Sequence, residues 1–230
     1  SEGPKLHLGQ SEPILSNSNE IEVEPTPEEV VQQQNGHCFY VHTFTSPSYC
    51  NLCHDFVWGI RKQALKCDCC GYVVHQQCKE KVVDQPCYTA KFIRDDENPD
   101  KVQFEHFWIP GNTHGKKCVY CNKKTKAPKG GFDLTSKCYK CSSCVHNACL
   151  DSQTTPGKFC RPKFAPMMFC ADLLSMADPP ADYKPLLTFV NHKSGGQQGL
   201  SVLKDLRSFL TQEQVVSLLD ETPVGPANAL

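Results

Sequence analysis

Cysteine and histidine residues occur twice in the same order along the chain, and their spacing indicates metal binding. Residues 37–87 and residues 106–160 share one ordered pattern, made of two Cys-x2-Cys pairs, two histidines and two further cysteines. Eight thiolate and imidazole ligands complete two tetrahedral Cys3His sites, the structural type of zinc site, and leave no position open for catalysis. The sequence therefore predicts four structural zinc ions. The predicted ligands are His37, Cys50, Cys53, Cys67, Cys70, His75, Cys78, Cys87, His106, Cys118, Cys121, Cys138, Cys141, His146, Cys149 and Cys160.

A disulfide framework is the alternative explanation for sixteen cysteines. Cys-x2-Cys pairs interleaved with histidine favour zinc, and zinc in turn favours a reducing compartment. A segment of this length buries too little apolar surface to fold alone, whereas zinc supplies about 10–16 kcal/mol to small finger peptides. We expect the four remaining cysteines, Cys38, Cys69, Cys144 and Cys170, to be small buried hydrophobic residues. Cys69 competes with Cys70 for the role of ligand, and the x4 spacing to His75 favours Cys70.

Charge is nearly balanced over the chain, with 24 basic and 25 acidic residues, but it is segregated. Residues 1–36 carry one basic and seven acidic residues, which predicts an acidic disordered tail, whereas residues 106–160 carry nine lysines and two aspartates. No apolar run has membrane-spanning length, and no signal peptide is visible. The predicted divisions are a tail at 1–36, a zinc module at 37–87, a linker at 88–105, a basic zinc module at 106–160, a second linker at 161–184, and an α/β segment at 185–230.

The α/β segment is predicted from a change in pattern after Pro185. LLTFV is a short apolar run typical of a strand, SGGQQG is a turn, and LSVLKDLRSFL has helical spacing of its leucines. QVVSLL could form a second strand. Strand, glycine turn, helix and strand are the beginning of an α/β domain. The predicted fold class is thus small zinc-stabilised α+β modules followed by the N-terminal part of an α/β domain.

An apolar run, Phe56-Val57-Trp58-Gly59-Ile60, lies between the two Cys-x2-Cys pairs of the first repeat and is followed by Arg61 and Lys62. Folding back onto the module's own core is one explanation. The flanking charges favour another, because tryptophan suits a membrane interface and basic residues attract anionic headgroups at about 1 kcal/mol each. The loop is predicted to insert partly into a bilayer.

The eight-ligand order of each repeat resembles the C1 family, the diacylglycerol- and phorbol-ester-binding zinc modules of protein kinase C and diacylglycerol kinases. The resemblance implies cross-braced pairing of the ligands and a lipid groove between two loops at the tip. It implies the groove residues Pro47, Gly59 and Gln63, with Val57, Trp58 and Ile60 beside them, and aromatic residues at Phe39 and Phe44; Ala64 stands where glycine is usual.

The second repeat departs more from the family pattern. Lys116 and Lys117 replace the proline region, and the second loop, NKKTKAPKGGFDLTSK, is longer and lacks tryptophan. An anionic-surface patch formed by its lysines and a scaffolding role are weighed equally. Nucleic acid could match the charge, but no element typical of nucleic-acid readout is visible, so no nucleic-acid partner is expected.

The stretch Phe189-Val190-Asn191-His192-Lys193-Ser194-Gly195-Gly196 resembles the first strand and glycine turn of diacylglycerol kinase catalytic domains, with His192 where the family has proline. The resemblance implies ATP and Mg²⁺ as cofactors, transfer of the γ-phosphoryl group to diacylglycerol, and nucleotide phosphates near Asn191, Lys193, Ser194, Gly195 and Gly196. The family's GGDG motif does not occur in the 230 residues. We expect this chain to cover the regulatory part and the start of such a kinase, and to make no phosphatidate by itself.

Two functions remain open at this point. The first is a diacylglycerol kinase whose C1 modules recruit it to diacylglycerol and anionic membrane surfaces, with a cytoplasmic location and peripheral membrane association. The alternative is a non-catalytic C1-containing lipid-binding regulator or adaptor. The sequence leaves the oligomeric state open.

Overall fold

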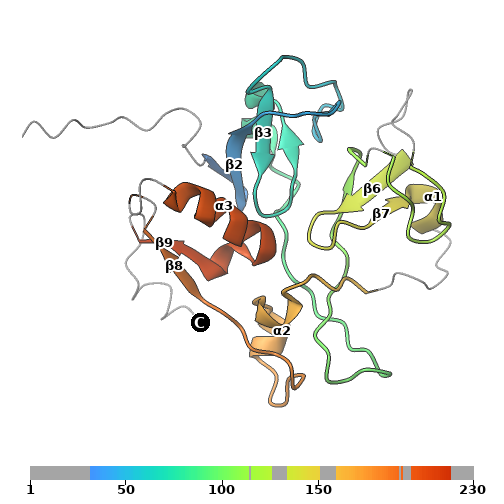
Figure 1. Cartoon of the computed structure of the whole chain (residues 1–230), viewed down its shortest axis with the longest axis vertical. Coiled ribbons are helices and arrows are strands. Elements are labelled where there is room, and N and C mark those ends of the chain that lie inside the picture. Colours follow the sequence, from blue (N-terminus) through green and yellow to red (C-terminus); the bar gives the residue numbers. More distant parts are fainter. Residues whose placement is uncertain are drawn as a thin grey trace, which may run out of the picture.

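The computed structural model describes residues 32–113, 115–125, 134–150, 159–191, 193 and 198–218. Over these residues, three small sheets of four, three and two strands surround a common core (Figure 1). The disorder predicted for residues 1–31 lies outside the described part of the chain.

Module one, residues 37–87, is built on the four-stranded sheet. Strands β1 (Gln32–Gln34), β2 (His37–His42), β3 (Ala64–Cys67) and β4 (Val73–Val74) pair antiparallel in sequence order, and the 3-10 helix η1 (Gln76–Lys81) follows. The antiparallel pairing brings the predicted ligand His37, at the start of β2, near the predicted ligand Cys67, at the end of β3.

Strand β1 corrects the prediction that the tail is disordered up to residue 36. Asn35 and Gly36 have φ angles of 45° and 75°, the left-handed conformations that an Asn-Gly hairpin turn requires. The Asn35 amide nitrogen also donates to the carbonyls of Val83 and Gln85, at 3.0 and 3.1 Å. The Asn-Gly turn therefore adds β1 as an edge strand to module one. The prediction of disorder rested on composition, which takes no account of this turn.

Module two, residues 106–160, repeats this arrangement with a three-stranded sheet. Strands β5 (Trp108–Pro110), β6 (Thr135–Cys138) and β7 (Cys144–His146) pair antiparallel, and the short helix α1 (Asn147–Leu150) follows directly. The two modules thus share strand order as well as ligand order.

Both stretches predicted as linkers are packed against the core. In the first, Phe104 is fully buried and forms β-bridges with Phe92 and with Cys160 of module two. The second contains the 3-10 helix η3 (Ala165–Met167) and helix α2 (Ala171–Leu174) and buries Met168 and Leu173. The domain boundaries stay predictions, but neither stretch is a loose connection.

The C-terminal segment forms a strand–helix–strand unit. Strand β8 (Thr188–Val190) pairs parallel with β9 (Val215–Ser217), and helix α3 (Gly199–Phe209) and the 3-10 helix η4 (Gln212–Gln214) connect them. This order agrees with the sequence prediction for these residues.

One buried glutamine joins the C-terminal unit to the preceding segment. The Gln214 amide nitrogen donates to the carbonyls of Met167 and Leu186, at 2.6 and 2.5 Å, and its oxygen accepts from the Phe169 amide at 2.7 Å. Because the side chain is fully buried, these bonds replace those that water would make. The α/β unit is therefore held on residues 165–186.

The two modules contact each other directly. The Asn51 amide donates to the Pro110 carbonyl at 2.8 Å, and the Asn112 side chain both accepts from and donates to the Tyr49 backbone, at 3.0 and 3.1 Å. At Gly71, with φ of +78°, a Cβ atom would overlap the ring of Tyr139. Backbone and ring therefore meet where only glycine fits.

Helix α3 is held by both modules. The Lys140 ammonium of module two donates to the carbonyls of Arg207, Ser208 and Leu210 at the helix C-terminus, at 2.9, 3.4 and 2.5 Å. Arg207 is itself paired with Asp68 of module one at 3.7 Å, and both side chains are buried. The α/β unit is thus docked onto the zinc modules by charged groups.

Candidate metal centres and the exposed loop tip

The structure brings the sixteen predicted ligands together into four groups, two in each module. Within every group, the four ligand atoms lie within 4.8 Å of one another. These are the pairings that the C1 resemblance implies, and each group joins residues far apart in the sequence. The groups are His37, Cys67, Cys70 and Cys87; Cys50, Cys53, His75 and Cys78; His106, Cys138, Cys141 and Cys160; and Cys118, Cys121, His146 and Cys149.

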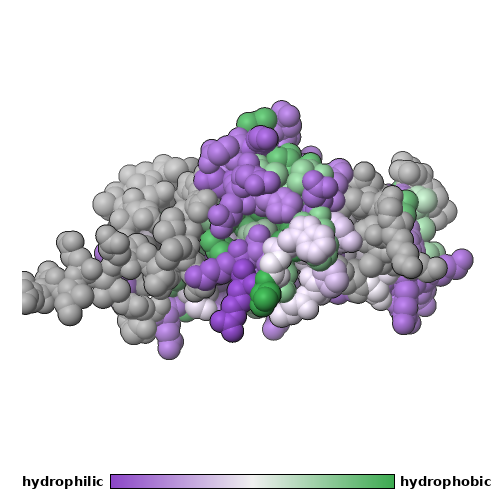
Figure 2. Space-filling model, turned by 90° about the horizontal axis from the view of Figure 1, so that it is seen from above, coloured by the Kyte–Doolittle hydropathy of each residue, from purple (hydrophilic) through white to green (hydrophobic). Residues whose placement is uncertain are grey.

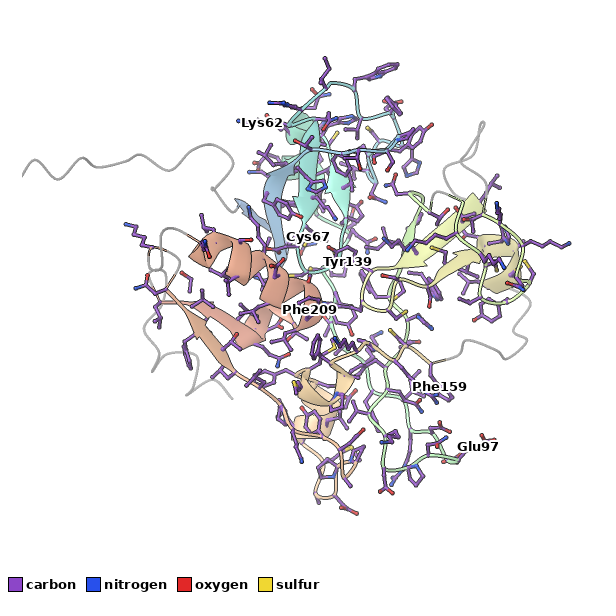
Figure 3. The ribbon with its side chains drawn as sticks, viewed as in Figure 1. Lys62, Cys67, Glu97, Tyr139, Phe159 and Phe209 are labelled. Atoms are coloured by element: carbon purple, nitrogen blue, oxygen red, sulfur yellow. The ribbon has the colours of Figure 1, made fainter. Side chains whose placement is uncertain are left out.

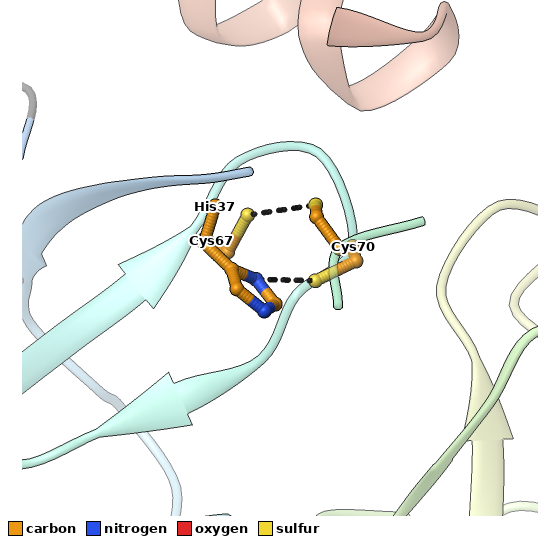
Figure 4. Close-up of side chains that lie close together, drawn as sticks. His37, Cys67 and Cys70 are labelled. Atoms are coloured by element: carbon orange, nitrogen blue, oxygen red, sulfur yellow. Dashed lines mark hydrogen bonds between the residues drawn. The ribbon is translucent and has the colours of Figure 1, made fainter. Parts of the chain in front are cut away.

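The separations between ligand atoms fit zinc. With Zn–S of about 2.3 Å and Zn–N of about 2.0–2.1 Å, tetrahedral ligand atoms lie roughly 3.5–3.8 Å apart. His37 Nδ1 is 3.4 Å from Cys70 Sγ (Figure 4). Cys67 Sγ is 3.7 Å from Cys87 Sγ. Comparable pairs in the other groups lie 3.3–3.9 Å apart. Disulfide bonds would need about 2.05 Å, so the clusters support structural zinc.

Backbone carbonyls orient two of the histidine ligands. His37 Nε2 lies 2.9 Å from the Gln85 carbonyl oxygen, and His75 Nε2 lies 3.2 Å from that of Phe56. A hydrogen on Nε2 leaves the Nδ1 lone pair free for the metal, which is the usual way a second group fixes a zinc-bound imidazole. The backbone carbonyls of Gln85 and Phe56 therefore orient these two ligands, and the spacing of the ligands in the sequence does not reveal this role.

The four cysteines outside the ligand sets are buried, as predicted. Cys38, Cys69, Cys144 and Cys170 are at most 2% exposed. Cys70, not Cys69, completes the first group, while Cys69 lies with Cys38 and Asp68.

The tip of module one consists of two loops, residues 43–48 and residues 57–63, here called the tip loops. The Gln63 side chain connects them: its oxygen accepts from the Phe44 amide at 2.9 Å, and its nitrogen donates to the Gly59 and Phe44 carbonyls, at 3.1 and 3.3 Å. Gly59 has φ of +121°, and a Cβ there would approach Gln63 Cγ to 3.2 Å. Glycine and glutamine together hold the loops in one geometry.

Apolar side chains are exposed at this tip. Trp58 and Ile60 are 79% and 91% exposed, and Arg61 and Lys62 behind them are exposed as well. Lys62 marks the far end of the module in Figure 3, and Figure 2, which views this end, shows pale and green surface bordered by purple. The nearby Pro47 is also exposed. Leaving large apolar groups in water is unfavourable, which indicates a partner surface.

Val57 is an exception to the predicted exposure of this loop. It is 5% exposed and packs with Ala64, Val73 and Phe44. Its amide donates to the Ser48 carbonyl at 2.8 Å, so the chain is extended here and side chains alternate between the two sides. Val57 therefore belongs to the small core beneath the tip, and the uniformly apolar run Phe56-Val57-Trp58 carries no sequence signal that separates it from Trp58.

The described part of module two presents a basic surface. Lys116, Lys117, Lys123 and Lys124 are exposed. Most of the second loop of this module, residues 126–133, lies outside the described residues.

Only part of the predicted phosphate loop is described. Asn191 follows β8 directly, and its side-chain oxygen accepts from the Lys193 amide at 3.1 Å, which closes a tight turn at the strand end. Ser194, Gly195 and Gly196 lie outside the described residues, so their predicted role is untested.

Comparisons with known proteins match residues 37–87 to one domain family and most of the chain to a group of enzymes. The family model described as the phorbol esters/diacylglycerol binding domain (C1 domain) matches residues 37–87. Diacylglycerol kinase 1 of Drosophila melanogaster is 30% identical over 208 residues, which is 79% of this chain. Diacylglycerol kinase delta of Mus musculus is 28% identical over 89% of the chain, and diacylglycerol kinase eta of Drosophila melanogaster is 30% identical over 82%.

The chain belongs to the diacylglycerol kinase family. It spans 17%, 18% and 10% of the lengths of these three relatives, so the similarity covers one region of each. Within the described part of the chain, no helix combines the length and apolarity needed to cross a bilayer. Module one, with its two ligand groups and its tip loops, is a C1 domain.

Proposed function

We propose that this chain is the regulatory part and catalytic-domain opening of a diacylglycerol kinase, and that module one recruits it to diacylglycerol in membranes. The observation that carries the proposal is the Gln63 amide, which spans the tip loops below exposed Trp58 and Ile60. A fixed pair of loops leaves backbone groups for the hydroxyl and ester of a lipid, while the apolar end enters the acyl region.

Zinc has a structural role in this proposal. Four ions, one in each Cys3His group, would close the loops on which the tip is built, and the closed coordination leaves no metal position for substrate. Metal analysis of the folded chain should find four zinc ions. Folding should depend on them, because each module alone has a small core.

The α/β unit would contribute to nucleotide binding. In the kinase reaction, a diacylglycerol hydroxyl oxygen attacks the γ-phosphorus of ATP, the bond to ADP breaks, and the hydroxyl proton leaves. ATP with Mg²⁺ supplies the phosphoryl group, and positioning carries most of such catalysis. Asn191 holds the turn after β8, where the loop amides and Lys193 would face the phosphates.

Co-sedimentation with phosphatidylcholine vesicles, with and without diacylglycerol, tests the lipid-binding part. We expect diacylglycerol to increase binding, and Gln63→Leu to abolish that increase because leucine cannot bond to Phe44 or Gly59. Gln77→Leu makes the same change at an exposed position in η1 and should retain the response. Equal responses of the two variants, or no response of the natural chain, would refute the proposal.

A further inference from the structure

A cavity of about 210 Å³ lies between the two modules, apart from the tip loop at residues 57–63. One wall comes from β2, the loop at 43–48 and β3 of module one. The other comes from residues 109–112 and 137–139 of module two. Figure 3 shows Tyr139 beside Cys67 in the middle of the molecule, where the modules approach each other.

Two lysines face this cavity from equivalent places. Lys66 and Lys137 each precede the first cysteine of the second Cys-x2-Cys pair in their module. Their ammonium groups lie 5.1 and 5.6 Å from the centroid of the Tyr139 ring, so the modules direct both charges at one spot. The attraction between each ammonium and the ring face is worth only about 0.5–2 kcal/mol.

No carboxylate in the described part of the chain pairs with these cations. None of the residues lining the cavity is acidic. Across the described ranges, neither ammonium has a carboxylate within 4.0 Å, although five other ion pairs occur there. Half-buried cations without a paired carboxylate are unfavourable, so the two ammonium groups would gain from an anion placed between them.

The walls are held in place before any ligand arrives. Asn51 connects β4 to Pro110 of module two, through bonds of 2.8 Å to Val73 N and to the Pro110 carbonyl, and Asn112 binds the Tyr49 backbone. His42 adds a neutral polar ring, because burial and the Lys66 and Lys204 charges lower its pKa to about 4. A preorganised site loses less free energy to ordering on binding.

We propose that this cavity binds a phosphate monoester. Two ammonium groups match the charge of about −2 that such a group carries near neutral pH. Lysine is a common phosphate ligand. A water needs about 10–15 Å³ of cavity, so there is room for a phosphate and part of its ester. The ester can be a soluble metabolite, or the headgroup of a lipid such as phosphatidate, since Phe44 and Ser48 belong both to the cavity wall and to a tip loop.

This site shares the loop at residues 43–48 with the proposed diacylglycerol groove, but neither Gln63 nor any other residue of 57–63 lines it. Loss of the diacylglycerol response and loss of phosphate binding are therefore separable, the first through Gln63 and the second through the two lysines.

Titration of the full zinc-loaded chain with glycerol 3-phosphate, followed by amide NMR, tests the site. We expect saturable shifts at Gly71, Gly111 and Asn112, and an affinity at least tenfold lower in the Lys66→Gln/Lys137→Gln variant. The Lys91→Gln/Lys101→Gln variant removes two exposed charges elsewhere and should stay within twofold. Zinc content and amide dispersion show that the variants are folded. Shifts that map elsewhere in the natural chain, or equal losses in both variants, overturn the proposal.

Vesicles distinguish the two sources of the ester. Binding to phosphatidate vesicles that exceeds binding to phosphatidylglycerol vesicles of equal net charge, and that requires Lys66 and Lys137, assigns the site to a lipid headgroup. Lysine-dependent binding of glycerol 3-phosphate without a phosphatidate preference assigns it to a soluble ester, and both results support the proposal. A lysine dependence that is the same for both lipids, without binding of the soluble ester, indicates general charge attraction and overturns it.

Discussion

Serine at position 58 or 60 should weaken the binding of the chain to diacylglycerol-containing vesicles without unfolding it. Trp58 and Ile60 are 79% and 91% exposed, so nearly all of their burial would come from the membrane. Full burial of such a side chain is worth about 1.5–3 kcal/mol, and partial insertion gives about 1–3 kcal/mol. At 1.4 kcal/mol for each factor of ten, Ile60→Ser and Trp58→Ser should each lower the partition coefficient by about five- to a hundredfold.

Sedimentation at several salt concentrations measures this effect and separates it from charge. Arg61 and Lys62 contribute about 1 kcal/mol each near an anionic surface, and salt screens that contribution. The apolar contribution should persist at high salt. Val83→Ser is the matched control, because Val83 is 62% exposed but lies beyond η1, away from the tip loops.

The result that refutes this reasoning is a loss with Val83→Ser equal to that with Ile60→Ser, or a change below twofold in both tip variants. Val57→Ser is expected to differ in kind. Since Val57 is buried beneath the tip, its replacement should lower the melting temperature even in the absence of vesicles.

Three further predictions concern contacts between the parts of the molecule. Arg207→Met should lower the free energy of unfolding by about 3 kcal/mol, because it leaves Asp68 buried without its partner, and Asp68→Asn/Arg207→Met should cost less than the sum of the single changes in chemical denaturation; additive costs would contradict this. Gly71→Ala should lower the melting temperature more than Gly115→Ala, because both glycines have positive φ but only the first Cβ meets the Tyr139 ring; equal shifts would show that the ring contact is unimportant. The His42 ring should remain neutral down to pH 5.5 in an NMR titration, since its folded pKa is about 4, below the ordinary 6.5. The unfolded chain then binds the proton at higher pH than the folded chain, so this contribution to stability is complete above pH 6.5 and decreases as pH falls toward 4. A midpoint near 6.5 would contradict the burial of this ring, and Lys66→Gln should raise its pKa.

Ligand spacing and local periodicity predicted the parts of this molecule that depend on neighbours in sequence. The Cys-x2-Cys pairs and histidines predicted the metal ligands, and the spacing of the leucines in LSVLKDLRSFL predicted helix α3. Zinc chemistry constrains residue types strongly, so a pattern of ligands is informative even without a core.

Apart from the ligand pairings that the C1 resemblance implied, contacts between distant residues were not predicted. Gln214 binds carbonyls 47 and 28 residues away, and Lys140 reaches α3 across 67 to 70 residues. Residues 161–184 are rich in proline and show no periodicity, yet Met168, Cys170 and Leu173 within them are buried because other segments pack on them. The cavity between Lys66 and Lys137 likewise arises only when the two repeats meet, which no single repeat encodes.

The interleaving of ligands gives module one an unusual response to a break in the chain. A cut after Arg61 or Lys62, both exposed in the loop between Cys53 and Cys67, leaves His37, Cys50 and Cys53 on one fragment and the other five ligands on the second. Each metal ion would then be shared by both pieces. Limited trypsin digestion should give two bands on a denaturing gel but one species on a sizing column, until a chelator releases them. The two halves of the module would thus be held together by their shared metal ions, even when the backbone between them is cut.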